Sequence, residues 1–204
     1  MNKDEIYELL YTRYNRRTPI PPSTLPEIDL YMDQVTTFME DKLKKQRRYP
    51  EDKILTKTMI NNYTKNKLLP PPVKKKYNQD HLLTLIYTYY LKNILSISDI
   101  NTLLTPMIRD FWTGSIAERE EEDSLPPMSM KEIYEQILSL EPDTLEDTWE
   151  DVRRKIDAVD QLFSEADIPE EAREYLQKFS FCILLVLDIY MKKQMLEQLI
   201  DDMK

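Results

Sequence analysis

Apolar residues recur every three to four positions along most of this chain, which is the spacing that places them on one face of an α-helix. The first such segment covers about Lys3 to Tyr14, and the second runs from about Glu27 to Gln46. The second helix is expected to bury Ile28, Met32, Val35, Met39 and Leu43. The pattern therefore predicts a chain that begins with helices.

Capping residues indicate where the later helices begin, because a side-chain oxygen there can accept a hydrogen bond from the first helical turn. In the middle of the chain the expected helices run from Thr56 to Asn66, from Asn78 to Leu95, and from Ser96 or Ser98 to near Leu104. Further on they run from Ser129, with Glu132 as a capping box, to Leu140, and from Thr144, with Asp147, to about Ser164. The last starts at Asp167, with Pro169 near its beginning, and continues to Met203, a length of roughly 50 Å.

The composition supports a helical fold and narrows the chemistry. Gly114 is the single glycine, so tight hairpins and glycine-lined phosphate loops have almost no raw material. One cysteine, Cys182, and one histidine, His81, leave too few ligands for a zinc site and no intrachain disulfide. Cys182 is expected to be a buried thiol in a reducing compartment, and His81 to have no catalytic role. We expect an all-α protein with no metal site, cofactor or catalytic residues.

No segment of the sequence predicts a membrane or export function. The N-terminal stretch carries charges within its apolar residues, unlike a secretory signal. The longest apolar run, Phe179 to Leu187, is less than half of the roughly 20 residues that a membrane-spanning helix needs. We therefore expect a cytoplasmic protein with no membrane partner.

Charge divides the chain into modules. The formal net charge is -9, yet residues 42–76 hold 12 basic and 2 acidic side chains, while residues 118–204 hold 10 basic and 24 acidic ones. A basic surface attracts phosphate and an acidic one repels it, so the two surfaces must face different partners. We expect an N-terminal domain over 1–112, an acidic linker with a Pro-Pro pair over 113–128, and a C-terminal helical domain over 129–204.

The basic segment contains a short helix with two different faces. Met59, Ile60 and Tyr63 repeat at helical spacing and are expected to pack inward. The remaining positions carry side chains that bind base edges and phosphates, and the candidate DNA-binding residues are Lys57, Thr58, Asn61, Asn62, Thr64 and Lys65. Asparagine can pair with adenine through two hydrogen bonds, and lysine can meet guanine or phosphate. This helix is thus the candidate for reading DNA.

The sequence LLPPPVKKKY follows this helix and adds three lysines. Lys74, Lys75 and Lys76 are expected on a short loop beside the helix, where they can contact phosphates without reading sequence. The next helix is apolar around much of its circumference, so it is interpreted as a buried support, and its Tyr87, Tyr89 and Tyr90 as core residues.

The order of these features resembles the helix-turn-helix of MerR-type transcription regulators, and more closely a bacterial family typified by the YkrK regulator. The matching residues are Asn62-Tyr63, Leu68-Leu69-Pro70, Lys76-Tyr77 and Ser98-Asp99-Ile100, within a helix-turn-helix core of about 50–105. The resemblance implies a recognition helix over Thr56 to Lys67, a wing at Lys74 to Lys76, and a dimerising C-terminal helix. Two features depart from the family: Lys67 replaces its usual glycine, and the wing lacks an Asn-Gly turn, so a shortened, less strand-like wing is expected.

Two functions of different classes remain open at this point. The first is a sequence-specific transcription regulator that binds double-stranded DNA as a homodimer and acts as a repressor, with any small-molecule effector left open. Its dimer would form through the long last helix, which has more apolar residues than one stripe can bury. The second is a helical adaptor whose acidic C-terminal module binds a basic protein. An enzyme is not expected, because no nucleophile motif or histidine pair is present.

Overall fold

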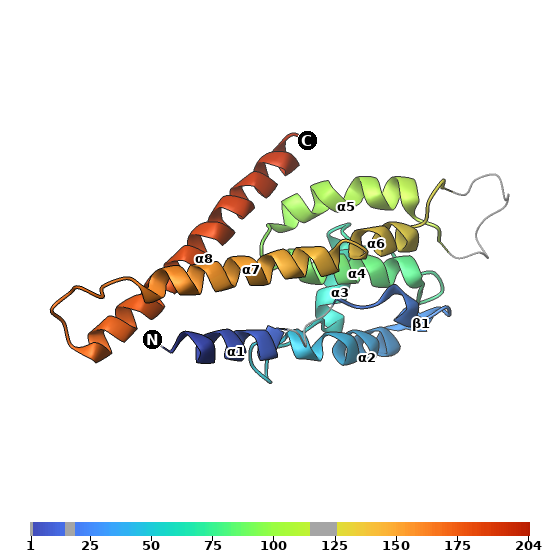
Figure 1. Cartoon of the computed structure of the whole chain (residues 1–204). Coiled ribbons are helices and arrows are strands. Elements are labelled where there is room, and N and C mark those ends of the chain that lie inside the picture. The colour runs from blue at the N-terminus through green and yellow to red at the C-terminus, as the bar shows by residue number, and fades with distance from the viewer. Residues whose placement is uncertain (1, 15–18, 115–125) are drawn as a thin grey trace. The chain divides into compact units, whose positions relative to one another are not determined.

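The computed structural model describes residues 2–14, 19–114 and 126–204, and most of them lie in α-helices (Figure 1). The helices are α1 (Lys3–Tyr14), α2 (Met32–Leu43), α3 (Lys57–Lys65), α4 (Gln79–Leu91), α5 (Ile97–Phe111), α6 (Met130–Leu138), α7 (Glu141–Asp160) and α8 (Glu170–Asp201), with short 3-10 helices η1 (Pro22–Thr24) and η2 (Lys44–Gln46). Two short strands, β1 (Leu30–Tyr31) and β2 (Lys76–Tyr77), pair antiparallel. The expectation of a helical protein is confirmed at this level.

The chain forms two compact units, and they group the helices differently from the expected domains. Unit 1 contains α1 together with Ser139–Leu196, and unit 2 contains Pro19–Leu138 together with Glu197–Lys204. The N-terminal helix therefore joins α7 and most of α8, although it was expected in the N-terminal domain. The central part of the expected linker, residues 115–125, lies outside the described residues.

Helix α4 is the centre of unit 2, as the apolar sequence around its circumference predicted. Leu82, Leu83, Leu85 and Ile86 are fully buried, and so are Ile60 of α3 and Ile100 of α5. Tyr89 is buried, and Tyr87 packs edge-on against Tyr134 with 5.6 Å between the ring centroids. A helix buried on this scale can hold its neighbours in fixed positions, because core side chains are close-packed.

Helix α6 belongs to unit 2, although it was expected to open the C-terminal domain. Its Met130 is fully buried, and the Tyr134 hydroxyl donates a 2.9 Å hydrogen bond to the carbonyl oxygen of Ile20. Burial raises the pKa of the Tyr134 phenol above its usual range. The sequence alone did not predict this contact, because Ile20 and Tyr134 are separated by most of the unit.

Asp80 links the segment after α5 to the start of α4. Its buried carboxylate accepts hydrogen bonds from the Thr113 backbone N–H at 2.7 Å, from the Thr113 hydroxyl at 2.7 Å and from the Gly114 N–H at 3.0 Å. Gly114 has a φ of 67°, which glycine adopts without the steric cost of a Cβ atom. The single glycine of the sequence thus permits the turn that brings these donors to the carboxylate.

Unit 1 is built from α1, α7 and α8. Its core consists of Ile156, Val159 and Phe181, with half-buried apolar residues of α1, α7 and α8 packed around them. Trp149 of α7 lies against the ring of Tyr11 with 5.0 Å between the centroids, and also contacts Tyr7 and Tyr14. These aromatic contacts attach α1 to α7.

Several helix boundaries differ from the predictions. Helix α2 begins at Met32, because the Tyr31 backbone N–H donates to the Gln34 side chain in a capping arrangement, and Ile28 is 70% exposed. Helix α5 continues through Pro106 to Phe111 and does not end near Leu104, since half-buried apolar residues follow the proline. Helix α7 starts at Glu141 with Pro142 in its first turn, and not at Thr144.

The cysteine environment also differs from the prediction. Cys182 is exposed, because the core side of α8 is set by its neighbour Phe181 and the next residue along an α-helix points about 100° away. Among the described residues, no helix is both long and apolar enough to cross a membrane.

Candidate nucleic-acid interface

Helix α3 begins where the sequence predicted, and one of its faces packs into unit 2. The Thr56 hydroxyl oxygen caps the helix by accepting a hydrogen bond from the Met59 backbone N–H at 3.2 Å. Ile60 and Tyr63 are buried, and Met59 is half-buried. Because these apolar side chains fix the orientation of the helix, the polar residues between them must face away from the core.

The exposed face of α3 carries most of the predicted DNA-binding residues, namely Lys57, Thr58, Asn61, Asn62 and Lys65. The Lys57 ammonium forms an ion pair with the Asp33 carboxylate of α2. Thr64 is half-buried, and its hydroxyl donates to the Ile60 carbonyl oxygen at 3.3 Å, within its own helix. The two asparagines are thus exposed to solvent, whereas the Thr64 hydroxyl is turned toward the helix backbone.

The chain leaves α3 through a Schellman motif in which a lysine takes the usual place of glycine. Lys67 has a φ of 60°. The Leu68 N–H donates to the Tyr63 carbonyl oxygen at 2.9 Å, and the Lys67 N–H donates to the Thr64 carbonyl oxygen at 3.1 Å, which is the pairing of that motif. Lys67 was not predicted as a site residue, although it stands before Leu-Leu, where the regulators that the sequence resembles carry a glycine.

The predicted wing is a β-hairpin with lysines at its tip. Val73 and Lys76 exchange two backbone hydrogen bonds of 3.1 and 2.9 Å, and Lys74 and Lys75 form the two-residue turn between them. Both turn residues are exposed and have positive φ, 50° and 65°, as in a type I′ turn. The pairing within the wing is limited to this one bridge, as in the shortened, less strand-like wing that was expected.

The hairpin is attached to the start of α2. Tyr31 of β1 pairs with Lys76 of β2, and Leu30 pairs with Tyr77. The Lys76 ammonium lies 5.4 Å from the centroid of the Tyr31 ring, a cation–π distance, so this lysine is half-buried and differs from the two at the tip. Lys76 therefore supports the hairpin, and Lys74 and Lys75 extend from it.

Two polar side chains, one half-buried and one buried, stabilise the frame behind this surface. Lys92 at the end of α4 donates a 2.9 Å hydrogen bond to the Ile54 carbonyl oxygen in the segment before α3, and burial lowers its pKa. The His81 Nδ1 atom accepts from the Asn78 backbone N–H at 3.1 Å, which completes a capping box at the start of α4. Burial lowers the pKa of His81 to about 4, so the ring is neutral near pH 7.

Comparison with known proteins identifies the segment that contains this surface. Residues 20–137 match the family described as "Domain of unknown function (DUF1836)". The chain belongs to the DUF1836 family. The matched residues nearly coincide with the continuous segment Pro19–Leu138 of unit 2, so the DUF1836 domain contains α3, the hairpin and the buried α4. No curated protein and no solved structure shows a significant match.

Within the described residues, no group of three or more His, Cys, Asp or Glu side chains is placed to hold a metal ion. The chemistry that the DUF1836 domain displays at α3 and the hairpin is that of hydrogen-bond donors and positive charge. It suits recognition of an anionic, hydrogen-bonding partner.

Proposed function

We propose that the DUF1836 domain of this chain binds double-stranded DNA in a sequence-specific manner, and that the protein is a transcription regulator. The observation that carries the proposal is the group of exposed lysines on and beside α3. Lys65, Lys67, Lys74 and Lys75 are exposed, and none has an ion pair with a described residue. In a chain of formal net charge -9, such uncompensated positive charge favours a phosphate partner.

The arrangement of the elements supports a helix-turn-helix with a wing. Helix α2 precedes α3 and contacts it through the Asp33–Lys57 ion pair, and the hairpin follows α3 directly. An α-helix with its side chains is about 10–12 Å in diameter, so a DNA major groove about 12 Å wide admits α3. In this proposal Asn61 and Asn62 read base edges, while Lys74 and Lys75 contact phosphates.

We propose further that the protein acts as a homodimer and as a repressor. A short reading helix gains affinity when two copies bind half-sites about one helical turn apart. A regulator that occludes a promoter lowers transcription, so repression is the simplest proposal for the direction of regulation. The MerR-type resemblance of the sequence supports the dimer but does not distinguish repression from activation.

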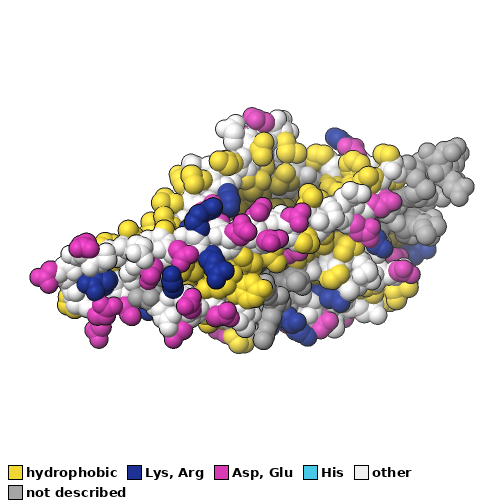
Figure 2. Space-filling model, in the orientation of Figure 1, with side chains coloured by type: hydrophobic (Ala, Val, Ile, Leu, Met, Phe, Trp, Pro, Cys, Tyr) yellow, Lys and Arg dark blue, Asp and Glu magenta, His cyan; other side chains and the backbone are white. Residues whose placement is uncertain are grey.

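Helix α8 offers a surface for this dimer. One stripe of large apolar residues is exposed along it, and its members are Tyr175, Phe179, Ile183, Val186, Leu187 and Tyr190. Helical spacing puts this stripe opposite the side of α8 that carries Phe181 and Leu184, which pack in the core of unit 1. Figure 2 shows hydrophobic side chains along the outer edge of α8.

The area of the stripe fits a second copy of the chain. At exposures between 40% and 66%, the six side chains leave roughly 600 Å² accessible, close to the 800 Å² or so that each partner buries in a standard interface. In a two-fold symmetric dimer the same surface patch of the two copies meets, and an apolar stripe on one helix can meet its own copy in this way. The stripe thus supports a homodimer formed through α8.

Selection from random duplex DNA, followed by a salt titration, tests the proposed function. We expect one sequence to be enriched, to survive competitor DNA, and to be released steeply as salt rises. The same selection with single-stranded DNA should enrich nothing. If no duplex is preferred at moderate salt, DNA binding is excluded, and the adaptor function, in which the acidic unit 1 binds a basic protein, becomes the better proposal.

A further inference from the structure

Unit 1 contains a cavity that the DNA-binding proposal does not use. Its volume is about 630 Å³, within the range of small-molecule sites. The walls come from all three helices of the unit, and their apolar side chains are Leu10 and Tyr14 of α1, Leu145, Trp149 and Val152 of α7, and Leu185 and Ile189 of α8. An opening of this size with such walls can hold an apolar molecule.

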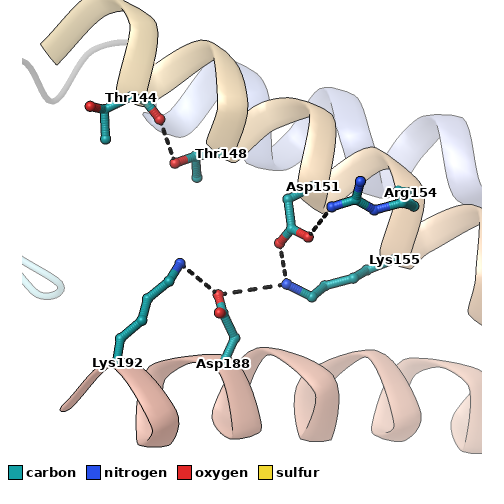
Figure 3. Close-up of polar contacts among 7 residues, drawn as sticks. All are labelled: Thr144, Thr148, Asp151, Arg154, Lys155, Asp188 and Lys192. Carbon is teal, nitrogen blue, oxygen red and sulfur yellow. Dashed lines mark hydrogen bonds and ion pairs between the residues drawn. The ribbon is translucent and has the colours of Figure 1, made fainter. Parts of the chain in front are cut away.

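Charged and hydroxyl side chains line the cavity alongside the apolar ones, and most are already engaged with each other. The Asp188 carboxylate lies 3.1 Å from the Lys192 ammonium and 3.6 Å from that of Lys155 (Figure 3). Lys155 also pairs with Asp151, which accepts a further hydrogen bond of 2.8 Å from Arg154. This chain of ion pairs ties α7 to α8 and leaves Asp151 and Asp188 compensated.

Asp147 is the lining carboxylate that has no partner among the described residues. It lies on α7 beside Thr144 and Thr148. Both hydroxyls donate to a carbonyl oxygen of the preceding turn. The Thr144 hydroxyl donates to Leu140 at 2.9 Å, and the Thr148 hydroxyl donates to Thr144 at 2.7 Å (Figure 3). Because their protons are used within the helix, the two hydroxyl oxygens can only accept hydrogen bonds from a ligand.

The charge of unit 1 also favours a ligand that donates hydrogen bonds and is positively charged. Residues 139–196 hold 14 acidic and 7 basic side chains, and a negative field of this kind raises the local concentration of cations. The aromatic rings of Trp149 and Tyr14 on the wall can also attract a cation through their π faces. The cavity thus combines apolar walls with hydrogen-bond acceptors, negative charge and aromatic rings. This combination suits a ligand in which an ammonium group is attached to an apolar body.

We infer that this cavity is a binding site for an organic cation with an apolar body, and that Asp147 holds the cationic group. The apolar part lies against the leucine, valine and isoleucine side chains, and the ammonium donates to Asp147 and to the hydroxyl oxygens of Thr144 and Thr148. The site belongs to unit 1 and lies outside the matched DUF1836 residues.

Trp149 allows a direct test. The protein has two tryptophans, so a full-length Trp112→Phe chain emits from Trp149 alone. The indole N–H of Trp149 is buried without a hydrogen-bond partner among the described residues, and its proton signal therefore reports on any ligand that enters. This chain is titrated with octylammonium, octanol and octanoate, which share one tail and differ in their head groups.

We expect octylammonium to saturate the change in Trp149 emission with an affinity about fivefold above that of octanol, the size of a partly exposed ion pair, and octanoate to bind more weakly still. In an Asp147→Asn chain the affinity for octylammonium should fall to that for octanol. The matched control Asp143→Asn removes an exposed acid of the same helix that does not line the cavity, and should leave all three affinities unchanged.

Three results would overturn the inference. They are the absence of a saturable response to octylammonium, equal affinities for the three compounds, and an Asp147→Asn chain that keeps the preference for the ammonium. Circular dichroism of each variant establishes that it is folded before the titration.

Discussion

Lys74 and Lys75 are consecutive residues with φ angles of 50° and 65°, and together they form the turn of the Val73–Lys76 hairpin. This conformation favours asparagine and glycine, and a non-glycine residue in it costs roughly 1 kcal/mol. Strain of this kind tends to be kept where a side chain has a function.

We therefore predict that replacing both lysines by the preferred turn residues, Lys74→Asn with Lys75→Gly, stabilises the fold and weakens DNA binding. The free energy of unfolding should rise by about 1 kcal/mol, and the slope of log affinity against log salt should become shallower by about 2. Chemical denaturation and salt-dependent binding measure the two effects. A Lys74→Arg, Lys75→Arg chain keeps the charge and should keep the slope. If the Asn-Gly chain binds DNA like the wild type, the tip does not contact phosphates.

Lys67 gives a second prediction about strain. With a φ of 60° in the Schellman motif after α3, it occupies a position that glycine fills without a steric cost. Lys67→Gly should raise the free energy of unfolding by about 1 kcal/mol. Lys65→Gly, two residues earlier at the last residue of α3, where φ is negative, should lower it, by up to about 1 kcal/mol. Thermal unfolding of both variants checks the opposite signs, and a loss of stability in Lys67→Gly would contradict the conformational argument.

Asn61 tests sequence reading by α3. It is exposed on the face opposite the buried Ile60 and Tyr63, so Asn61→Ala should leave the fold intact. Loss of a bidentate contact should cost about 1 to 3 kcal/mol at particular base pairs and relax the preference there, whereas Lys75→Ala should weaken all sequences alike. Binding to a set of single-base variants of the selected site distinguishes them. An equal loss on every sequence in Asn61→Ala would rule out base reading by this residue.

We predict that the buried His81 makes the folded protein less stable in acid. Its pKa is about 4 in the folded protein and 6.5 in the unfolded chain, so the unfolded state binds more protons between these values. The stabilisation is therefore fully present above pH 6.5 and falls, by up to about 3 kcal/mol, as the pH drops toward 4. His81→Gln keeps a hydrogen-bond acceptor at the capping-box position but does not titrate. Denaturation from pH 7 to pH 4 should show a smaller loss in this variant, and equal losses would exclude His81 as the cause.

The proposed dimer predicts a change of mass in one variant and not in its control. Ile183→Glu puts a charge into the middle of the α8 stripe and should convert the dimer to a monomer, as measured by light scattering at micromolar concentration. Ile137→Glu changes an isoleucine of α6 that is 50% exposed and should leave the mass unchanged. The exposed Cys182 beside the stripe gives a second measurement, because its reaction with a thiol reagent should slow as the protein concentration rises. A wild-type monomer would exclude the dimer.

The sequence by itself determined the helical class and most helix starts, because a cap is a local interaction. Thr56, Asn78 and Ser96 each accept a hydrogen bond from an N–H three residues along, and Ser129 with Glu132 forms the expected capping box. The donor face of α3 was also predictable, since helical spacing separates it from the apolar residues. Local spacing, however, contains no information on which distant element a helix meets.

Tertiary structure decided the rest. Helix α6 joined unit 2 through the contact of Tyr134 with Ile20, and α1 joined α7 through Trp149, although both were expected in the other domain. The hairpin turn at Lys74 and Lys75 formed without glycine because Lys76 and Tyr77 pair with β1, a strand more than 40 residues away in the sequence. The cavity beside Asp147 likewise exists only where three helices from separate parts of the chain meet. Each of these features depends on contacts between residues that are remote in sequence, and the energy of those contacts overrides local preference.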